Sequence, residues 1–306
     1  MTPPSTISVN SVSFGVLTKA KLADYVQLSK PRIAVMAMVT VTIGFALGSS
    51  LTGWNTIQLL KSMLGIALVA AGSSALNQAL EKKTDRLMPR TADRPLPSGR
   101  MSMAETIAFG AGTGIAGTAW LAVTVNVTTA ILGAMTLFLY VAVYTPLKRK
   151  TALCTAIGAI PGAMPPVLGW AASGAPLNAQ AFSLFAILFL WQFPHFLAIA
   201  WIYRHQYQGA GLKMLPETKT PRAIGIMSVA YAIVLLPVSL LPSEVALAGT
   251  GYSFAALVLG IGYAFFALRF AIDECDATAR KLLLSSLIYL PVLLLILCWD
   301  HLQLLS

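Results

Sequence analysis

Residues 57–100 read "IQLLKSMLGIALVAAGSSALNQALEKKTDRLMPRTADRPLPSGR" and contain both kinds of segment from which this chain is built. The first part, residues 57–80, is an apolar run, and about 20 such residues suffice for a helix to cross a bilayer. The second part, residues 81–100, is dense in Lys, Arg, Asp and Glu and carries prolines and a glycine. The same alternation continues along the chain and predicts a polytopic helical membrane protein.

The composition of the whole chain agrees with this prediction. Of 306 residues, 57% are hydrophobic and only 10% are charged, whereas a soluble domain has about 25% charged residues. The strands of a membrane barrel would be runs of about ten residues with alternating polarity, and that pattern is absent. The expected fold is all-α, with nine transmembrane helices around a central cavity. The expected helices lie near Arg32–Leu51, Ile57–Leu80, Ala104–Val123, Thr128–Thr145, Ala152–Ser173, Ala179–Tyr203, Ala223–Leu241, Val245–Phe270 and Leu282–Trp299.

The positive charges alternate between successive connections. Of the 21 Lys and Arg residues, only Lys61 lies towards the side that we predict to be extracytoplasmic. The charged connections are long, and one of them contains Arg204, Lys213, Lys219 and Arg222, whereas the uncharged ones are as short as "VNVT". Cytoplasmic loops carry the excess of Lys and Arg. We therefore expect a cytoplasmic N-terminus, an extracytoplasmic C-terminus and functional residues on the cytoplasmic side, and the net charge of +10 reflects topology and not nucleic-acid binding.

The remaining features of the chain set its organisation and location. The first residues lack the apolar core of a signal peptide, and they lack the arginines of a mitochondrial transit peptide, so we expect a bacterial inner membrane. We expect a cytoplasmic segment at residues 1–27 and a single domain at residues 28–306. The loops at 81–103 and 204–222 each follow a helical hairpin, which suggests an internal duplication around a shared cavity. Three isolated cysteines indicate neither a disulfide framework nor a metal site.

Asn77, Glu81 and Asp85 follow one another at intervals of four residues. At this spacing successive side chains drift by only about 40° around a helix, so the three lie on one face. Oxygen donors of this kind suit Mg²⁺, which takes one or two carboxylates and completes its shell with water and phosphate oxygens. The cationic neighbours Lys82, Lys83, Arg86, Arg90 and Arg94 would oppose a cation alone. They favour a cation that arrives with a diphosphate, whose oxygens Arg binds in a bidentate manner.

The alternative is a solvated loop that obeys the positive-inside rule and holds ordinary surface ion pairs. Asn77 argues against it, because a polar side chain inside an apolar segment needs a partner. "DRPLPSGR" (93–100) predicts a stiff turn, and that turn either returns the chain to the membrane or forms a wall of an anion site. "PGAMPP" (161–166) is expected to interrupt the fifth helix where it lines a cavity.

These stretches together resemble the UbiA-type intramembrane prenyltransferases, and within them the branch that farnesylates haem b. The motif at 77–85 is similar to the family's Asn-x-x-x-Asp-x-x-x-Asp, with Glu81 at the first Asp. The resemblance covers roughly residues 20–300. It extends to "LSKPRI" (28–33), "RPLPSGR" (94–100), "LFLYVAVYTPLKRKT" (137–151), "GAIPGAMPPVLGWAA" (158–172), "FAILFLWQFPHFLA" (185–198) and "AGLKMLP" (210–216).

The resemblance implies that farnesyl diphosphate binds through Mg²⁺ at two motifs on cytoplasmic loops. Asn77, Glu81 and Asp85 would hold the metal. The second motif departs from the family pattern, because Gln206 stands where the family has Asp, with Tyr207 after it and His205, a poor Mg²⁺ ligand, before it. Gln206 would be a further, uncharged metal ligand. Diphosphate contacts are implied for Arg86, Arg90, Arg94, Tyr144, Lys148, Arg149 and Lys213.

The acceptor implied for this branch is a vinyl group of haem b, and the product is haem O for terminal oxidases. His195, a histidine within an apolar segment, would contact the haem together with Gln192 one turn earlier. A haem A synthase or an oxidase assembly complex would be a partner. Three alternatives remain open: a prenyltransferase with a quinone-precursor or chlorophyllide acceptor, a non-catalytic haem carrier, and an organic-anion transporter.

Overall fold

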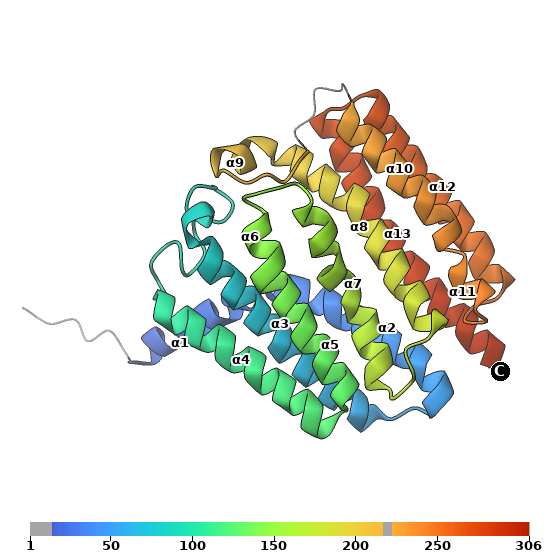
Figure 1. The fold of residues 1–306 in the computed structure, drawn as a ribbon, viewed down its shortest axis with the longest axis horizontal. Helices are drawn as coiled ribbons and strands as arrows, with labels where there is room; N and C mark the ends of the chain where they lie inside the picture. Colours follow the sequence, from blue (N-terminus) through green and yellow to red (C-terminus); the bar gives the residue numbers. More distant parts are fainter. Residues whose placement is uncertain (1–13, 217–221, 306) are drawn as a thin grey trace, which may run out of the picture.

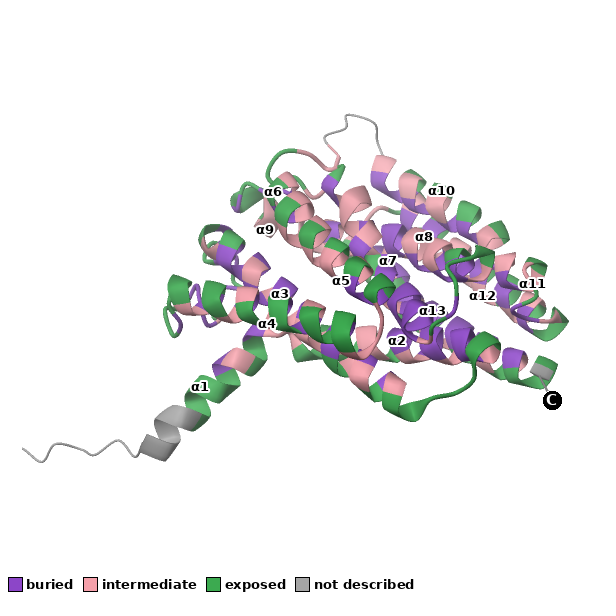
Figure 2. Ribbon diagram, turned by 60° about the horizontal axis from the view of Figure 1, so that its bottom comes forward, coloured by how far each residue is buried: buried purple, intermediate pink, exposed green. Residues whose placement is uncertain are grey.

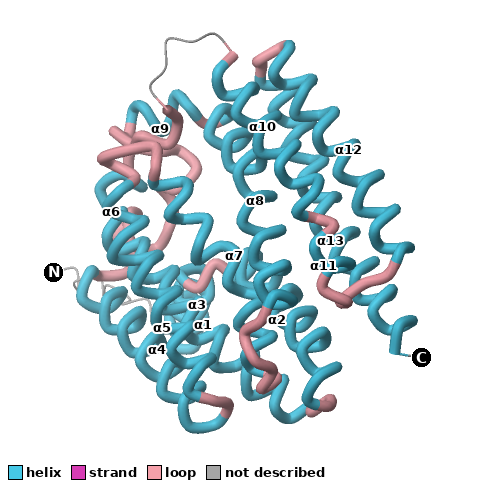
Figure 3. The backbone as a smooth tube through the Cα atoms, turned by 45° about the vertical axis from the view of Figure 1, so that its right-hand side comes forward, coloured by secondary structure: helices cyan, strands magenta, loops and turns pink. Residues whose placement is uncertain are grey.

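The computed structural model describes residues 14–216 and 222–305, and these parts are helices joined by loops, without a strand (Figure 3). Residues 1–13, part of the predicted N-terminal segment, lie outside the described residues. Lys219 also lies outside them. The elements, in chain order, are α1 (Phe14–Leu28), α2 (Pro31–Thr52), α3 (Thr56–Asp85), α4 (Met103–Thr124), α5 (Val127–Phe138), the π-helix η1 (Leu139–Tyr144), α6 (Thr145–Leu147), α7 (Cys154–Ala172), α8 (Ala179–Ile202), α9 (Arg204–Gly209), α10 (Ala223–Val238), α11 (Leu241–Glu244), α12 (Thr250–Ile272) and α13 (Asp276–Leu305).

The prediction of an all-α polytopic membrane protein is confirmed. Within the described residues, eight segments are helical, long enough and apolar enough to cross a membrane. They comprise α2, α3, α4, α8, α12 and α13, together with the combined segments α5–η1–α6 and α10–α11. The one predicted membrane helix outside these eight segments is the fifth, α7, which has 19 residues and three internal prolines and lies among the other helices (Figure 1). The count of nine is therefore approximate, because α7 is not among the eight segments that are long and apolar enough to cross a membrane.

The outer surface of the bundle is apolar. Ile115, Val123 and Phe254 are each at least 70% exposed. Figure 2 shows exposed residues on the outer helices such as α4, and buried residues concentrated around α7, α2 and α13. Large apolar side chains in such numbers have no place on a water-facing surface, so these faces contact lipid.

The fifth predicted helix is not interrupted, which corrects the expectation for "PGAMPP". α7 runs through Pro161, Pro165 and Pro166 without a break. Prolines are tolerated inside membrane helices where neighbouring groups satisfy the freed backbone, and α7 is enclosed by α2, α5 and α8. α2 and α7 approach backbone to backbone, because a Cβ on Gly44 would stand 1.9 Å from the carbonyl oxygen of Pro166. Small residues permit such close helix packing in membranes.

The charged loops gather at one end of the bundle. The loop after α3, the segment after α6 and the segment around α9 all lie at the upper left of Figure 1. Met88 of the first loop packs with Ala210 and Leu212 of the third. The Lys213 N–H donates to the Lys148 carbonyl oxygen at 2.7 Å, which joins the third segment to the second. The two loops singled out in the sequence therefore meet at one place.

Candidate active site

A small polar pocket lies where these three segments meet the end of α3. Its volume is about 110 Å³. It is lined by Lys30, Asn77, Glu81, Asp85, Met88, Arg90, Arg94, Tyr140, Tyr144, Lys148, Tyr207, Leu212 and Met214. Four of these side chains are cationic and two are anionic, so the pocket carries an excess of positive charge.

Asn77, Glu81 and Asp85 lie on one face of α3 and line this pocket. Asn77 and Asp85 are each 1% exposed and Glu81 is 7% exposed. The Asn77 side-chain amide donates to Glu81 Oε2 at 3.0 Å, one helical turn further on. These side chains belong to a helix of 30 residues, so their period stays regular up to the end of the helix at Asp85. A loop with ordinary surface ion pairs, the alternative interpretation, would leave them exposed.

Each of the three residues is paired with a different cationic side chain. Lys30 Nζ donates to Asn77 Oδ1 at 3.0 Å, Lys148 Nζ to Glu81 Oε1 at 2.8 Å and Arg94 Nη1 to Asp85 Oδ2 at 2.7 Å. These cations come from three separate segments: the α1–α2 junction, the end of α6 and the loop after α3. A buried carboxylate is strongly destabilising without such a partner. The fold therefore brings donors and cations together in pairs.

The loop after α3 is compact, as "DRPLPSGR" predicted. The Thr91 hydroxyl donates to the Asp85 carbonyl oxygen at 2.8 Å, and the Met101 N–H donates to the Pro95 carbonyl oxygen at 3.0 Å. Leu96 is fully buried, and Gly99 takes the positive φ of 84° that closes the turn. This turn holds Arg94 against Asp85.

The wall opposite α3 is the π-helix η1. The wider π turn places Tyr140 and Tyr144 side by side, with ring centroids 5.5 Å apart. The Thr145 hydroxyl donates to the Tyr140 carbonyl oxygen and accepts from the Asn77 amide at 3.0 Å. Lys148 Nζ lies 4.4 Å from the centroid of the Tyr144 ring. Single π turns inside α-helices are frequent at functional sites.

Of the two residues predicted at the second motif, Tyr207 reaches the pocket and Gln206 does not. Tyr207 lines the pocket, and its hydroxyl accepts from Arg90 Nη2 at 3.5 Å. Gln206 does not line it, and its Oε1 is buried without a hydrogen-bond partner among the described residues. His205 is exposed. The helix breaks at Tyr203 before α9 begins. The helical period of α8 therefore does not predict which residue of α9 faces the pocket.

Several other predicted residues lie away from the pocket. Arg86 is exposed, and Arg149 donates to the Leu80 carbonyl oxygen at 3.0 Å. Lys213 lines two larger cavities instead. His195 Nδ1 is hydrogen-bonded to the Ser286 hydroxyl at 2.7 Å, and Gln192 Nε2 donates to the carbonyl oxygens of Leu188 and Ala159. Their contact with a haem stays a prediction.

Sequence reasoning missed Lys30, Tyr140 and Thr145. Lys30 counted only as a topological charge, although its position directly before Pro31 at the start of a membrane helix was a usable signal. No sequence pattern pointed to Tyr140 or Thr145. An α-helical period does not predict which side chains a π turn directs to the pocket.

Lys148 and Tyr207, which line the pocket, both have a raised pKa and therefore stay protonated at neutral pH. Burial opposes the charged form of Lys148, but Tyr144 and the Glu81 carboxylate favour it, and the pKa of the lysine is raised. Burial also raises the pKa of Tyr207, although the charge of Arg90 acts in the opposite direction. At neutral pH the pocket therefore presents an ammonium group and a phenol that can both donate to an anion.

The oxygen atoms of Asn77, Glu81 and Asp85 suit a hard cation that binds together with an anion. Among residues 14–216 and 222–305 no group of three His, Cys, Asp or Glu side chains could enclose a metal. Two carboxylates and one amide oxygen match Mg²⁺, provided that phosphate oxygens and water supply the remaining ligands.

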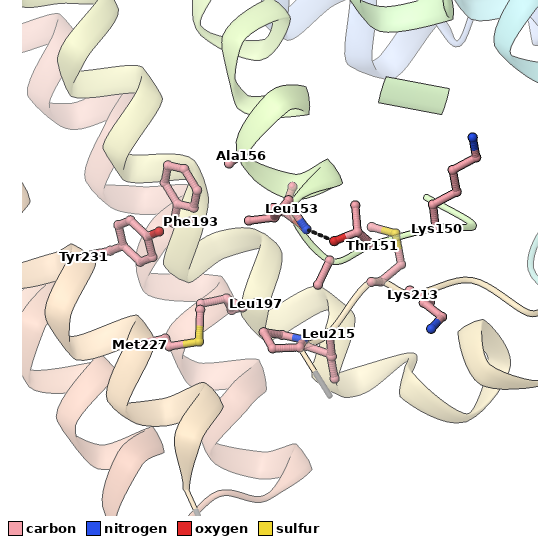
Figure 4. A pocket seen from close by; sticks show the side chains of 14 residues that line it. Lys150, Thr151, Leu153, Ala156, Phe193, Leu197, Lys213, Leu215, Met227 and Tyr231 are labelled. Atoms are coloured by element: carbon pink, nitrogen blue, oxygen red, sulfur yellow. Dashed lines mark hydrogen bonds between the residues drawn. The ribbon is translucent and has the colours of Figure 1, made fainter. Parts of the chain in front are cut away.

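A larger cavity of about 400 Å³ lies beside this pocket, between α7, α8 and α10. The two cavities share Met214 as a wall. Figure 4 shows the Phe193 and Tyr231 rings at one end of it and the Lys150 and Lys213 side chains at the other. The two rings are stacked with centroids 4.1 Å apart. The cavity is therefore amphipathic, and its volume is within the range of small-molecule sites.

The fold and this pocket define a membrane-embedded protein in which a positively charged polar pocket adjoins an amphipathic cavity. The profile of the UbiA prenyltransferase family matches residues 37–291. The chain is 42% identical over 281 residues to a protein of Solibacter usitatus named protoheme IX farnesyltransferase, covering 89% of this chain and 96% of that protein. It is 41% identical over 290 residues to the protein of the same name from Koribacter versatilis, covering 92% and 94%. The chain belongs to the UbiA prenyltransferase family.

Solved structures agree on the fold. The chain superposes on a digeranylgeranylglyceryl phosphate synthase with a TM-score of 0.76 at 18% identity, covering 93% of this chain and 99% of the other. It superposes on a UbiA homolog from Archaeoglobus fulgidus, bound to GPP and Mg²⁺, with a TM-score of 0.62 at 16% identity, covering 90% and 99%.

Proposed function

We propose that this protein transfers the farnesyl group of farnesyl diphosphate to a vinyl group of protohaem IX, with uptake of water and release of diphosphate, to give haem O. The observation that carries the transfer reaction is the buried pocket in which Asn77, Glu81 and Asp85 face the cations Lys30, Arg94 and Lys148. The names of relatives at 41% and 42% identity support the choice of donor and acceptor.

Asn77, Glu81 and Asp85 would hold Mg²⁺. Their oxygens are hard donors, all are nearly buried, and phosphate oxygens would complete the shell. When bound, the metal neutralises charge on the diphosphate as the carbon–oxygen bond breaks.

The residues of the chain stabilise the departing diphosphate directly. Arg90, Arg94 and Lys148 would donate to its oxygens, and Tyr207 lies beside Arg90 as a neutral donor. Cations held in place before the reaction lower the barrier because they need no reorganisation when charge develops. Met88, Leu212 and Met214 close the pocket with apolar surface, which limits access of water to the allylic cation.

The acceptor needs an apolar cavity next to the diphosphate, since the two reacting carbons must come within about 3.5 Å. The 400 Å³ cavity between α7, α8 and α10 is the proposed acceptor site. Its aromatic end suits a porphyrin ring, and Lys150 and Lys213 suit carboxylates.

The alternating positive charges of the connecting loops support a location and an orientation for the protein. We place the pocket on the cytoplasmic side of a bacterial inner membrane, with the N-terminus cytoplasmic and the C-terminus extracytoplasmic. A haem A synthase or an oxidase assembly complex would receive the product.

The experiment is a reaction of purified protein with farnesyl diphosphate, Mg²⁺ and an equimolar mixture of protohaem IX and a quinone precursor, analysed by chromatography and mass spectrometry. The proposal predicts haem O and an equal amount of diphosphate. A prenylated quinone precursor would identify another acceptor class. Bound haem without diphosphate release would indicate a carrier, and neither binding nor release would leave transport as the remaining candidate.

A further inference from the structure

Lys30 occupies a backbone conformation that lysine rarely adopts. It is the last residue before α2, with φ 49° and ψ 62°, in the left-handed region. L-residues other than glycine, asparagine and aspartate avoid this region, and Pro31 restricts the preceding residue further. Such strained positions persist only where the surrounding structure holds them, and they cluster at active sites and ligand clamps.

The side chain of Lys30 is fixed on one of the three proposed metal donors. Its Nζ donates to Asn77 Oδ1 at 3.0 Å. Arg94 and Lys148 form ion pairs with Asp85 and Glu81, whereas no ion pair joins Lys30 to a carboxylate in the parts of the chain that the structure describes. Lys30 is therefore held by a neutral amide. The two neighbouring carboxylates are already balanced by Arg94 and Lys148.

This arrangement conflicts with a metal bound in the same place. A divalent cation on Asn77 Oδ1 would stand close to the ammonium group that now occupies this oxygen, and two cations at such a distance repel strongly in a buried site. The ammonium must therefore leave Asn77 when the metal enters. An anion that arrives together with the metal offers it a better acceptor, since phosphate oxygens form charge-assisted hydrogen bonds.

We propose that Lys30 is an exchangeable counter-ion, which occupies Asn77 while the pocket lacks diphosphate and moves to a phosphate oxygen when the metal and diphosphate bind together. This inference rests on the proposed function and adds an order to it: the metal binds with the diphosphate and not before it. Lys30 is then both a barrier to free metal and a direct contact for the substrate.

The test uses Mn²⁺ in place of Mg²⁺, with binding followed by electron paramagnetic resonance of the full-length protein. Each protein is titrated without and with inorganic pyrophosphate. Lys30→Asn removes the charge but tolerates the left-handed backbone, and Lys30→Arg keeps the charge. Lys83→Asn is the matched control, because Lys83 is an exposed lysine of α3 outside the pocket.

The unaltered protein should bind Mn²⁺ weakly alone and at least about 30-fold more tightly with pyrophosphate, a coupling of the size common between linked sites. Lys30→Asn should bind Mn²⁺ alone more tightly, by about threefold to tenfold, and the pyrophosphate complex about tenfold more weakly. Lys30→Arg keeps the charge and should bind Mn²⁺ alone as weakly as the unaltered protein, and Lys83→Asn should match the unaltered protein in both titrations.

A Lys30→Asn variant that binds Mn²⁺ alone no better than the unaltered protein would overturn the counter-ion exchange while leaving the proposed function intact. If the unaltered protein retains no Mn²⁺ even with pyrophosphate, the proposed function and the exchange both fail.

Discussion

The end of α3 and the short helix α9 carry the two stretches that resemble the family's motifs, and they contribute to the pocket in different ways. α3 contributes three oxygen donors in strict succession, each paired with a cation. α9 contributes Tyr207, whereas Gln206, the residue predicted as a metal ligand, lies outside the pocket. The comparison indicates that Gln206 is not one of the oxygen donors of this pocket. We therefore expect metal binding to depend on α3, and α9 to supply a contact to the substrate.

The largest effect should follow loss of an α3 carboxylate. Glu81→Ala or Asp85→Ala should lower kcat/KM for farnesyl transfer at least about 100-fold, equivalent to about 3 kcal/mol of transition-state stabilisation. Asp93→Ala is the control, because Asp93 is an exposed carboxylate of the adjoining loop. Steady-state rates of diphosphate release provide the measurement. Equal losses in Asp93→Ala and Glu81→Ala would contradict a specific role for the α3 face.

The next effect concerns the buried pair of Lys148 and Glu81. Lys148→Met leaves the Glu81 carboxylate buried without its partner, which should cost about 3 kcal/mol of stability. Adding Glu81→Gln removes the unpaired charge and should restore most of that stability without restoring activity. Thermal unfolding in detergent, read as Tm, tests the first part and diphosphate release the second. A double variant that recovers activity would show that the pair is only structural.

A smaller effect separates the two neighbours on α9. Tyr207→Phe removes a hydroxyl that would donate to the diphosphate in the proposed function, and should raise KM for farnesyl diphosphate about tenfold, a loss of about 1.4 kcal/mol. Gln206→Ala should change it less than about threefold, since Gln206 Oε1 has no partner to lose among the described residues. A larger rise in KM for Gln206→Ala than for Tyr207→Phe would contradict these roles of the two α9 residues.

The smallest effect is expected in the acceptor cavity. Met227→Trp fills part of the cavity between α7, α8 and α10, and should raise KM for protohaem IX about fivefold, or about 1 kcal/mol, with farnesyl diphosphate unaffected. Ile226→Trp is the matched control, because Ile226 is the adjacent residue of α10, 54% exposed and outside the cavity. A rise in KM for the diphosphate substrate would instead assign the cavity to the prenyl chain.

The parts of this molecule that the sequence predicts are those governed by short-range rules. The membrane helices follow from the length of their apolar runs, and the shared face of Asn77, Glu81 and Asp85 follows from the constant rotation of one long helix. The stiff turn before Met103 follows from its prolines and glycine.

The remaining features depend on contacts between distant segments. Lys30 meets Asn77 across 47 positions of sequence, and no local pattern reports such a pairing. The π turn at Leu139–Tyr144 and the start of α9 after Tyr203 reset the helical period, so the residues that face the pocket there could not be deduced. The continuity of α7 through three prolines was mispredicted because the enclosing helices outweigh the local preference.

The most direct test of the account is the retention of Mn²⁺ by the protein in the presence of farnesyl diphosphate, compared between the unaltered protein, Asp85→Asn and Gln206→Ala. Asp85→Asn preserves the size of the side chain, and Gln206→Ala removes the amide at the second motif. The account predicts that the unaltered protein and Gln206→Ala retain the metal with similar affinity, and that Asp85→Asn loses it by at least about tenfold. Retention by Asp85→Asn together with loss in Gln206→Ala would contradict the assignment of the metal site to the end of α3.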